Sequence, residues 1–217
     1  MLAHISEDKQ MIEAFRNNLD IHKITASEIF SVEEDEVTTE MRNKCKAVNF
    51  GIVYGISDFA LSQDLKISRK EAKEYMDKYF ARYVGVKYYL DNIIEFSKQN
   101  GYVRTIFNRI RNIPEIRSSN KIVKSLGERL SMNTPIQGSA ADIIKLAMIK
   151  VFNRLNSENL KSKIILQVHD ELVLNVFKNE LDKVSNIVKE EMELCYKDML
   201  VPLVVNISYG ENWFEAK

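Results

Sequence analysis

The sequence predicts an α+β fold, in which a mostly helical region comes before an antiparallel β-hairpin. Capping residues and apolar side chains at helical spacing recur through most of residues 1–155. The apolar spacing then changes, and two short runs typical of strands follow at 163–168 and 172–177. With 217 residues and 45% hydrophobic content, the chain can bury a substantial core.

The first forty residues are predicted to form two short helices and an acidic connector. Ser6 can cap the first helix and Asp20 begins the second, because such side chains accept hydrogen bonds from free backbone N–H groups. The connector ends at Thr38 or Thr39, either of which can cap the next helix. His22 lies in the first turn of the second helix, where N–H groups favour anions, although a lone histidine there is more often a plain surface residue.

Residues 38–100 are predicted to be nearly all helical, with short breaks between the helices. The breaks carry residues that start or stop helices, namely Gly55, Ser57, Ser68 and Gly101. Most aromatic side chains of this region are expected to pack in the core.

A short hairpin and two helices are predicted next. Residues 102–113 alternate as strands do, with Asn108 in the turn. Ser119 can cap a helix that Pro135 should break, because proline lacks the N–H that a helix interior needs. A long apolar helix is expected over 138–155.

The C-terminal part is predicted to be a small sheet with one helix. Strands 163–168 and 172–177 are close enough in sequence to pair as an antiparallel hairpin. An amphipathic helix over 179–198 and a last strand over 203–208 complete this part.

One helix, residues 42–55, has a pattern suited to a nucleotide. Arg42, Lys46, Phe50 and Tyr54 recur every fourth residue and drift only about 40° around the helix at each step. The two cations suit phosphates, and the two rings offer surfaces for a sugar and a base. The same spacing also fits an ordinary amphipathic helix with solvated cations and buried rings.

The charges are unevenly distributed, although the chain has 31 basic and 31 acidic residues. Residues 41–130 contain 18 Lys and Arg against 9 Asp and Glu, so this region is +9 and the rest of the chain is −9. Such a division is typical of a lobe that binds nucleic acid beside an acidic site, or of chance clustering on solvated helices.

The remaining composition points to a cytoplasmic protein without a membrane span. Cys45 and Cys195 are far apart, which suits a reducing compartment and excludes a cysteine zinc site. No apolar run reaches the length of a transmembrane helix, and no secretory leader is expected at the N-terminus.

A polar triplet, His169-Asp170-Glu171, lies between the two predicted strands. It fits an ordinary acidic turn, or a Mg²⁺ ligand for phosphoryl transfer, because hard cations prefer carboxylate oxygens. Neighbouring residues of an extended chain point in opposite directions. We therefore expect Asp170 to be the ligand and Glu171 to be peripheral. A two-metal site needs a further carboxylate strand, for which the chain offers no convincing candidate.

Three long polar side chains, Arg129, Asn133 and Gln137, also repeat at four-residue spacing. Such donors can reach acceptors on bases, sugars or phosphates, or they can be solvated surface residues.

In this order and spacing, the motifs resemble those of the family A DNA polymerases, the bacterial polymerase I type. The similarity runs from Leu2 to Trp213. Its motifs are Asp20-Ile-His22, Arg42-x3-Lys46-x3-Phe50-x3-Tyr54-Gly55, Asn133-x-Pro-x-Gln137-Gly138, Gln167-Val-His-Asp-Glu171 and Gly210-Glu-Asn-Trp213.

The resemblance implies roles for the residues singled out above. Those matching His22, Arg42 and Lys46 lie at the triphosphate of the incoming dNTP, the one matching Phe50 packs on its sugar and base, and the one matching Tyr54 guards the templating base. The primer–template contacts would be Arg129, Asn133, Gln137 and His169. Asp170 matches a metal-binding aspartate of a two-Mg²⁺ site, and Glu171 an acidic neighbour of lesser effect.

The resemblance also implies an incomplete polymerase right hand. Residues 1–37 would lead from palm to fingers, 38–130 would form the helical fingers lobe, and 131–217 would be the C-terminal part of an antiparallel-sheet palm. The family's first catalytic aspartate strand and its thumb have no match here. We therefore expect a DNA-directed DNA polymerase in the intact protein and no activity in these 217 residues alone. The alternative is a non-catalytic nucleic-acid-binding module.

Overall fold

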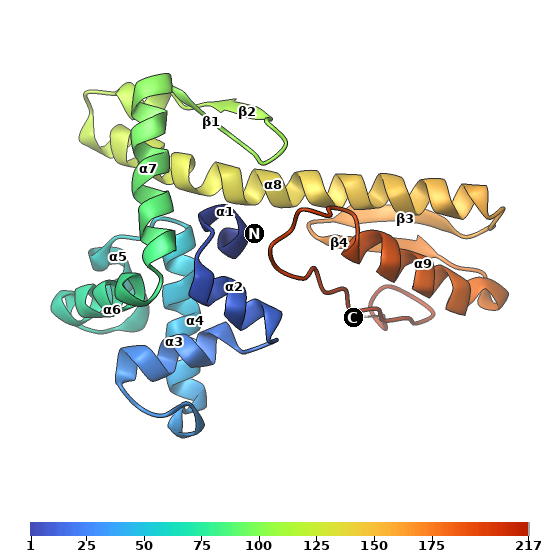
Figure 1. Ribbon diagram of the computed structural model, residues 1–217, viewed down its shortest axis with the longest axis horizontal. Helices are drawn as coiled ribbons and strands as arrows, with labels where there is room; N and C mark the ends of the chain where they lie inside the picture. Colours follow the sequence, from blue (N-terminus) through green and yellow to red (C-terminus); the bar gives the residue numbers. More distant parts are fainter. Residues whose placement is uncertain (217) are drawn as a thin grey trace. The chain divides into compact units, whose positions relative to one another are not determined.

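The computed structural model describes residues 1–216, which form two compact units, the first over Met1–Gly138 and the second beginning at Ser139 (Figure 1). Helices dominate the first unit, and the second contains an antiparallel hairpin, so the predicted α+β class is confirmed. Among the described residues, no helix is both long and apolar enough to cross a membrane.

Most of the first unit consists of helices. Its elements are α1 (Leu2–Ser6), α2 (Lys9–Arg16), α3 (Ile21–Phe30), η1 (Glu34–Glu36), α4 (Thr39–Val53), α5 (Asp58–Leu65), α6 (Arg69–Arg82), α7 (Val84–Asn100), β1 (Tyr102–Arg104), β2 (Ile110–Asn112), η2 (Pro114–Arg117) and the first half of α8 (Lys121–Ser157).

Most predicted helix boundaries in this unit are confirmed. Asp20, Thr38, Ser57 and Ser68 each accept a hydrogen bond from a backbone N–H of the helix that follows. Gly55 and Gly101 end helices with φ of 67° and 80°, the left-handed region that glycine adopts without strain. The hairpin β1–β2 forms as predicted, and Asn108 in its turn has φ of 61°.

Two predicted caps are wrong. Ser6 is the last, buried residue of the additional helix α1, and Asp8 caps α2 instead. Asn120 rather than Ser119 caps α8, because its Oδ1 accepts from the N–H of Ile122 at 2.9 Å.

The predicted break at Pro135 is also wrong, because α8 continues through it from Lys121 to Ser157. Proline removes one hydrogen bond and costs about 3 kcal/mol in a helix interior. Burial on both sides of Pro135 offsets that cost, since Ser131 and Ile136 are buried, and Ser131 Oγ hydrogen-bonds with Gly127 O at 2.8 Å and with Ser97 Oγ on α7 at 2.7 Å. Tertiary packing therefore overrides the local signal.

The second unit contains the second half of α8, β3 (Lys163–Val168), β4 (Glu171–Asn175), η3 (Lys178–Glu180) and α9 (Leu181–Glu193). Strands β3 and β4 pair antiparallel with a bulge between Ile164 and Leu166. The apolar side chains of α8 and α9 pack together with those of both strands. This core contains Val151, Leu155, Val184, Ile187 and Val188.

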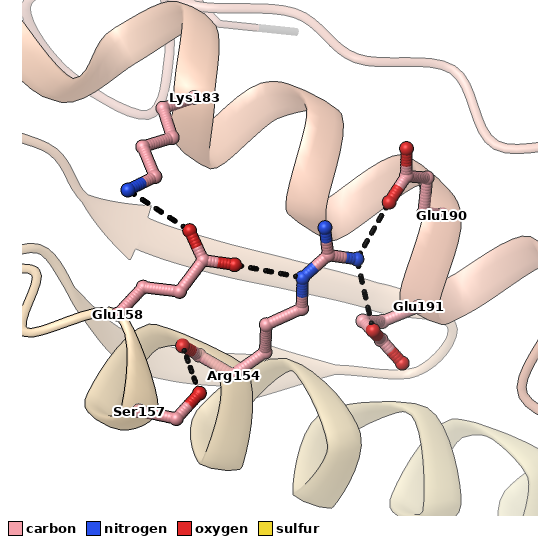
Figure 2. Close-up of polar contacts among 6 residues, drawn as sticks. All are labelled: Arg154, Ser157, Glu158, Lys183, Glu190 and Glu191. Atoms are coloured by element: carbon pink, nitrogen blue, oxygen red, sulfur yellow. Dashed lines mark hydrogen bonds and ion pairs between the residues drawn. The ribbon is translucent and has the colours of Figure 1, made fainter.

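A network of ion pairs joins α8 to α9 at the surface of this core (Figure 2). Arg154 lies between three carboxylates, with Nη1 2.6 Å from Glu190 and 3.0 Å from Glu191, and Nε 3.0 Å from Glu158. Glu158 also pairs with Lys183 at 2.9 Å. A connected network fixes the helix pair more effectively than isolated surface pairs, which contribute about 0–1 kcal/mol each.

The C-terminal predictions are partly wrong. The helix expected over 179–198 is divided into η3 and α9 and ends at Glu193, because the chain turns there to bury Cys195 and Val201. The strand expected over 203–208 is not assigned, since this segment has no ladder partner among residues 1–216. An apolar pattern forms a strand only where another strand can pair with it.

We expect that Asp8→Ala destabilises the first unit by about 2–4 kcal/mol, because Asp8 joins two helices. Its Oδ1 accepts from Met11 N at 2.9 Å to cap α2, and its Oδ2 accepts from Gly85 N at 2.8 Å in the first turn of α7. Urea unfolding should show the loss. Asp8→Asn should be intermediate, and the exposed Asp64→Ala should change little; equal effects of Asp8→Ala and Asp64→Ala would contradict this account.

Candidate nucleotide-binding helix and hairpin turn

Helix α4 has one buried face and one exposed face, and the predicted nucleotide residues lie on the exposed one. Cys45, Val48 and Ile52 are at most 2% exposed and pack in the core. The exposed face carries Arg42, Lys46, Phe50 and Tyr54, in the predicted line along the helix. Phe50 and Tyr54 are 49% and 50% exposed, so the alternative with buried rings is wrong for this helix.

Arg42 is held in place by Asp20, the residue that caps α3. Its Nε lies 2.6 Å from Asp20 Oδ2, while Asp20 Oδ1 accepts from the backbone N–H groups of His22 and Lys23. Burial alone would raise the pKa of Asp20, but the bond from Arg42 and the two backbone bonds together hold the pKa below its ordinary value. The carboxylate therefore stays charged and fixes the position of the guanidinium.

His22 and Lys46 both lie close to the Phe50 ring. The His22 and Phe50 ring centroids are 5.8 Å apart, and Lys46 Nζ is 6.0 Å from the Phe50 centroid, within the range of a cation–π contact. Burial lowers the pKa of His22, the charge of Asp20 opposes this effect, and the charges of Arg42 and Lys46 add to it. The imidazole is therefore neutral at pH 7.

The C-terminal end of α4 lies directly against α8. A Cβ added to Gly55 would be 2.3 Å from Met132 Cε and 3.0 Å from Arg129 Cγ, so those side chains would have to shift, and the φ of 67° at this position favours glycine in any case. Tyr54, the last residue before this glycine, is thus next to the helix that carries Arg129.

The three long polar side chains of α8 keep their four-residue spacing, because Pro135 does not interrupt the helix. Arg129 and Gln137 are exposed, whereas Asn133 is half-buried. The Oδ1 atom of Asn133 is buried without a hydrogen-bond partner among the described residues. The structure therefore brings the end of the α4 line next to the start of this second line of donors.

The polar triplet of the second unit forms the tip of the β3–β4 hairpin. His169 and Asp170 are the two turn residues, since Val168 pairs with Glu171, and all three triplet side chains are exposed. His169 has φ of 53°, and its carbonyl accepts from Gln167 Nε2. Within residues 1–216, no group of three acidic, histidine or cysteine side chains could hold a metal ion. Asp170 can therefore supply one carboxylate to a metal but does not form a site with its neighbours.

The chain is similar to a known protein family over nearly its whole length. The family model described as DNA polymerase family A matches residues 1–215. The chain belongs to DNA polymerase family A.

Relatives and a solved structure agree with this membership. The chain is 58% identical to the DNA polymerase I of Caldicellulosiruptor bescii and 54% identical to that of Geobacillus stearothermophilus. In both cases all of this chain is matched, and it spans 25% of the relative's length. The POL domain of Pol1 from M. smegmatis, solved in complex with DNA primer-template and dNTP, superposes with a TM-score of 0.94. That comparison has 45% identity and covers 99% of this chain and 38% of the other.

Sequence reasoning missed the roles of two residues that support helix α4. Asp20 was predicted only as a cap, but its ion pair with Arg42 joins positions 22 residues apart, which no helical spacing reveals. Asn49 contacts His22 across 27 residues and was not predicted, because a polar residue at a buried helix position has no periodic signal.

We expect Asp20→Asn to weaken folding by less than about 1 kcal/mol at pH 7, because the pair with Arg42 is partly exposed. Asn can still cap α3 through its one oxygen, so the ion pair and hydrogen bond with Arg42 are lost while the cap remains. The folded-state pKa of Asp20 is depressed, so its contribution is present above the unfolded-state pKa and is lost as pH falls through the folded-state pKa. Urea titrations of both proteins between pH 7 and pH 3 should show the difference in stability closing; a constant difference would refute the pair.

Proposed function

We propose that the intact protein is a DNA-directed DNA polymerase, which adds dNTPs to the 3′-OH of a primer in DNA replication or repair. The observation that carries the proposal is the exposed line of two cations and two rings along α4, in a chain of this family. The primer 3′-OH would attack the α-phosphorus of the dNTP, and pyrophosphate would leave. Primer–template DNA and dNTP as partners are supported by the POL domain of M. smegmatis Pol1, which was solved with both, and by the similarity to DNA polymerase I proteins.

In this proposal, the residues of α3 and α4 hold the incoming nucleotide. Lys46, with no acidic partner among residues 1–216, and the guanidinium of Arg42 would bind the triphosphate through charge-assisted hydrogen bonds. His22 would add a neutral donor beside them. Phe50 would pack on the sugar and base, and Tyr54 would guard the templating position.

The remaining candidates would contact DNA and metal. Arg129, Asn133 and Gln137 on α8 would follow the primer–template, together with His169. Mg²⁺, when bound, would activate the 3′-OH and neutralise the developing charge. Asp170 would provide one ligand oxygen and Glu171 would stay peripheral, with the other ligands from outside residues 1–216. The division into 1–37, 38–130 and 131–217 as palm-to-fingers, fingers and palm is part of the proposal, as is a location in the bacterial cytosol.

The test compares two kinds of binding in the intact protein. A dNTP complementary to the template should tighten binding to primer–template DNA, and Lys46→Ala should reduce this tightening about 10- to 100-fold, the value of one hydrogen bond to a charged group. Lys44→Ala is the matched control, because Lys44 lies on the same helix but pairs with Glu40 at 2.8 Å. Arg129→Ala should weaken DNA binding equally with and without dNTP.

Primer extension distinguishes the polymerase from a binding module. The intact protein should extend a primer in the presence of Mg²⁺, and Lys46→Ala should be impaired in the same proportion as dNTP binding. The 217-residue polypeptide alone should not extend the primer. Apart from the peripheral Glu171, it contains a single expected metal ligand, Asp170. Salt-dependent DNA binding that is indifferent to dNTP, without extension by the intact protein, would instead favour the non-catalytic nucleic-acid-binding module.

A further inference from the structure

A short chain of buried polar side chains lies behind the exposed face of α4. Asn49, 8% exposed, and Thr25, 1% exposed, meet between α4 and α3, where Thr25 Oγ1 is 3.2 Å from Asn49 Oδ1. Thr25 Oγ1 is also 2.7 Å from Ile21 O and 3.4 Å from the hydroxyl of Tyr83, which is 1% exposed. Buried polar groups are kept where each finds a partner, so this chain fixes the place of Asn49.

The other end of the Asn49 amide points to His22. Asn49 Nδ2 lies 2.8 Å from His22 Nδ1. An amide nitrogen only donates, so Nδ1 must be the acceptor and carry no proton. In a neutral imidazole the proton is then on Nε2, and that nitrogen can only donate.

The charges around the ring favour the neutral form that this bond requires. Burial of His22 and the neighbouring charges of Arg42 and Lys46 on α4 lower its pKa, against the opposing charge of Asp20 at the start of α3. Protonation at Nδ1 would place two donors against each other at 2.8 Å. Geometry and electrostatics therefore agree on one protonation state.

We propose that Asn49 is a positioning residue, which holds His22 as its neutral Nε2–H tautomer and so makes the ring a fixed hydrogen-bond donor. The protonation state stands on the structure alone. That the acceptor is a phosphate oxygen of a dNTP rests on the proposed function. A neutral donor beside Lys46 and Arg42 adds a directed contact to the triphosphate without adding a third positive charge.

The opposite arrangement gives a different, measurable state. If the amide of Asn49 were turned by 180°, Oδ1 would face His22, and Nδ1 would have to carry the proton. Nε2 would then be an acceptor and could not bind a phosphate oxygen. The position of one proton on His22 therefore decides between the two arrangements.

Nitrogen-15 NMR of the imidazole rings in the 217-residue chain measures this position directly. The chain has three histidines, and His22→Gln identifies the resonances of His22 by their loss. At pH 7 we expect the Nε2–H tautomer to exceed the other by at least about tenfold, the value of one buried hydrogen bond. A predominant Nδ1–H tautomer, or a charged ring, would overturn the proposal without any variant of Asn49.

Asn49→Asp then tests whether Asn49 is the cause. The substitution keeps the size of the side chain but replaces the donor by an acceptor, so the proton should move to Nδ1, as the Nδ1–H tautomer or the imidazolium. Asn43→Asp is the control, because it adds the same charge at an exposed position of α4. Unchanged His22 resonances in a folded Asn49→Asp protein, or equal changes in the two variants, would exclude the positioning role.

Addition of dATP and Mg²⁺ separates this inference from the proposed function. A shift of the His22 Nε2 resonance in the wild-type chain, reduced in Asn49→Asp, supports both. The Nε2–H tautomer without any shift on adding dATP supports the positioning role and counts against the dNTP as the partner of His22. A shift in a protein whose His22 carries its proton on Nδ1 supports the nucleotide site and overturns the role of Asn49.

Discussion

The candidate site depends on the burial of one face of α4. Cys45, Val48 and Ile52 are inaccessible to solvent or nearly so. Full burial of a valine or isoleucine side chain stabilises the folded state by about 1.5–3 kcal/mol. This burial fixes the rotation of the helix about its axis, because any other rotation would expose the apolar stripe. Arg42, Lys46, Phe50 and Tyr54 must then face outward. Burial also raises the pKa of the Cys45 thiol to about 12, so this cysteine serves packing rather than chemistry.

The two ends of α4 are also held in place by contacts with other helices. At the N-terminal end, Thr38 caps the helix and Asp20 fixes Arg42 from the neighbouring helix. At the C-terminal end, Gly55 adopts φ of 67° and lies directly against the Met132 and Arg129 side chains of α8. A helix fixed at both ends presents its functional groups in a preformed arrangement, which lowers the entropic cost of binding a ligand.

The sequence predicted most of the local structure but not the contacts between distant residues. Helix caps such as Asp20, Ser57 and Gly55 depend on their immediate neighbours in the sequence, so their residue types were sufficient to predict the helix boundaries. Pro135 was misjudged, because the burial around it and the Ser131–Ser97 bond connect helices far apart in the sequence. Residues 203–208 were misjudged for a related reason, since a strand requires a partner that a local pattern does not contain. The alignment of Arg42, Lys46, Phe50 and Tyr54 along α4 was predicted from their spacing, but only the structure shows that the two aromatic rings are exposed.

Under the proposed function, the distribution of charge among the site residues suits a nucleotidyl transfer. In such a transfer, tight binding of the pyrophosphate product would slow turnover, because the product must leave before the next substrate binds. Arg42 is already partly neutralised by Asp20, and His22 is kept neutral by burial and by the cations beside it. Of these two residues and Lys46, only Lys46 is a cation without an acidic partner among residues 1–216. In the proposed polymerase, Lys46 as a cation unpaired within the described residues, Arg42 as a cation shared with Asp20, and His22 as a neutral donor would orient a triphosphate and still let the product leave.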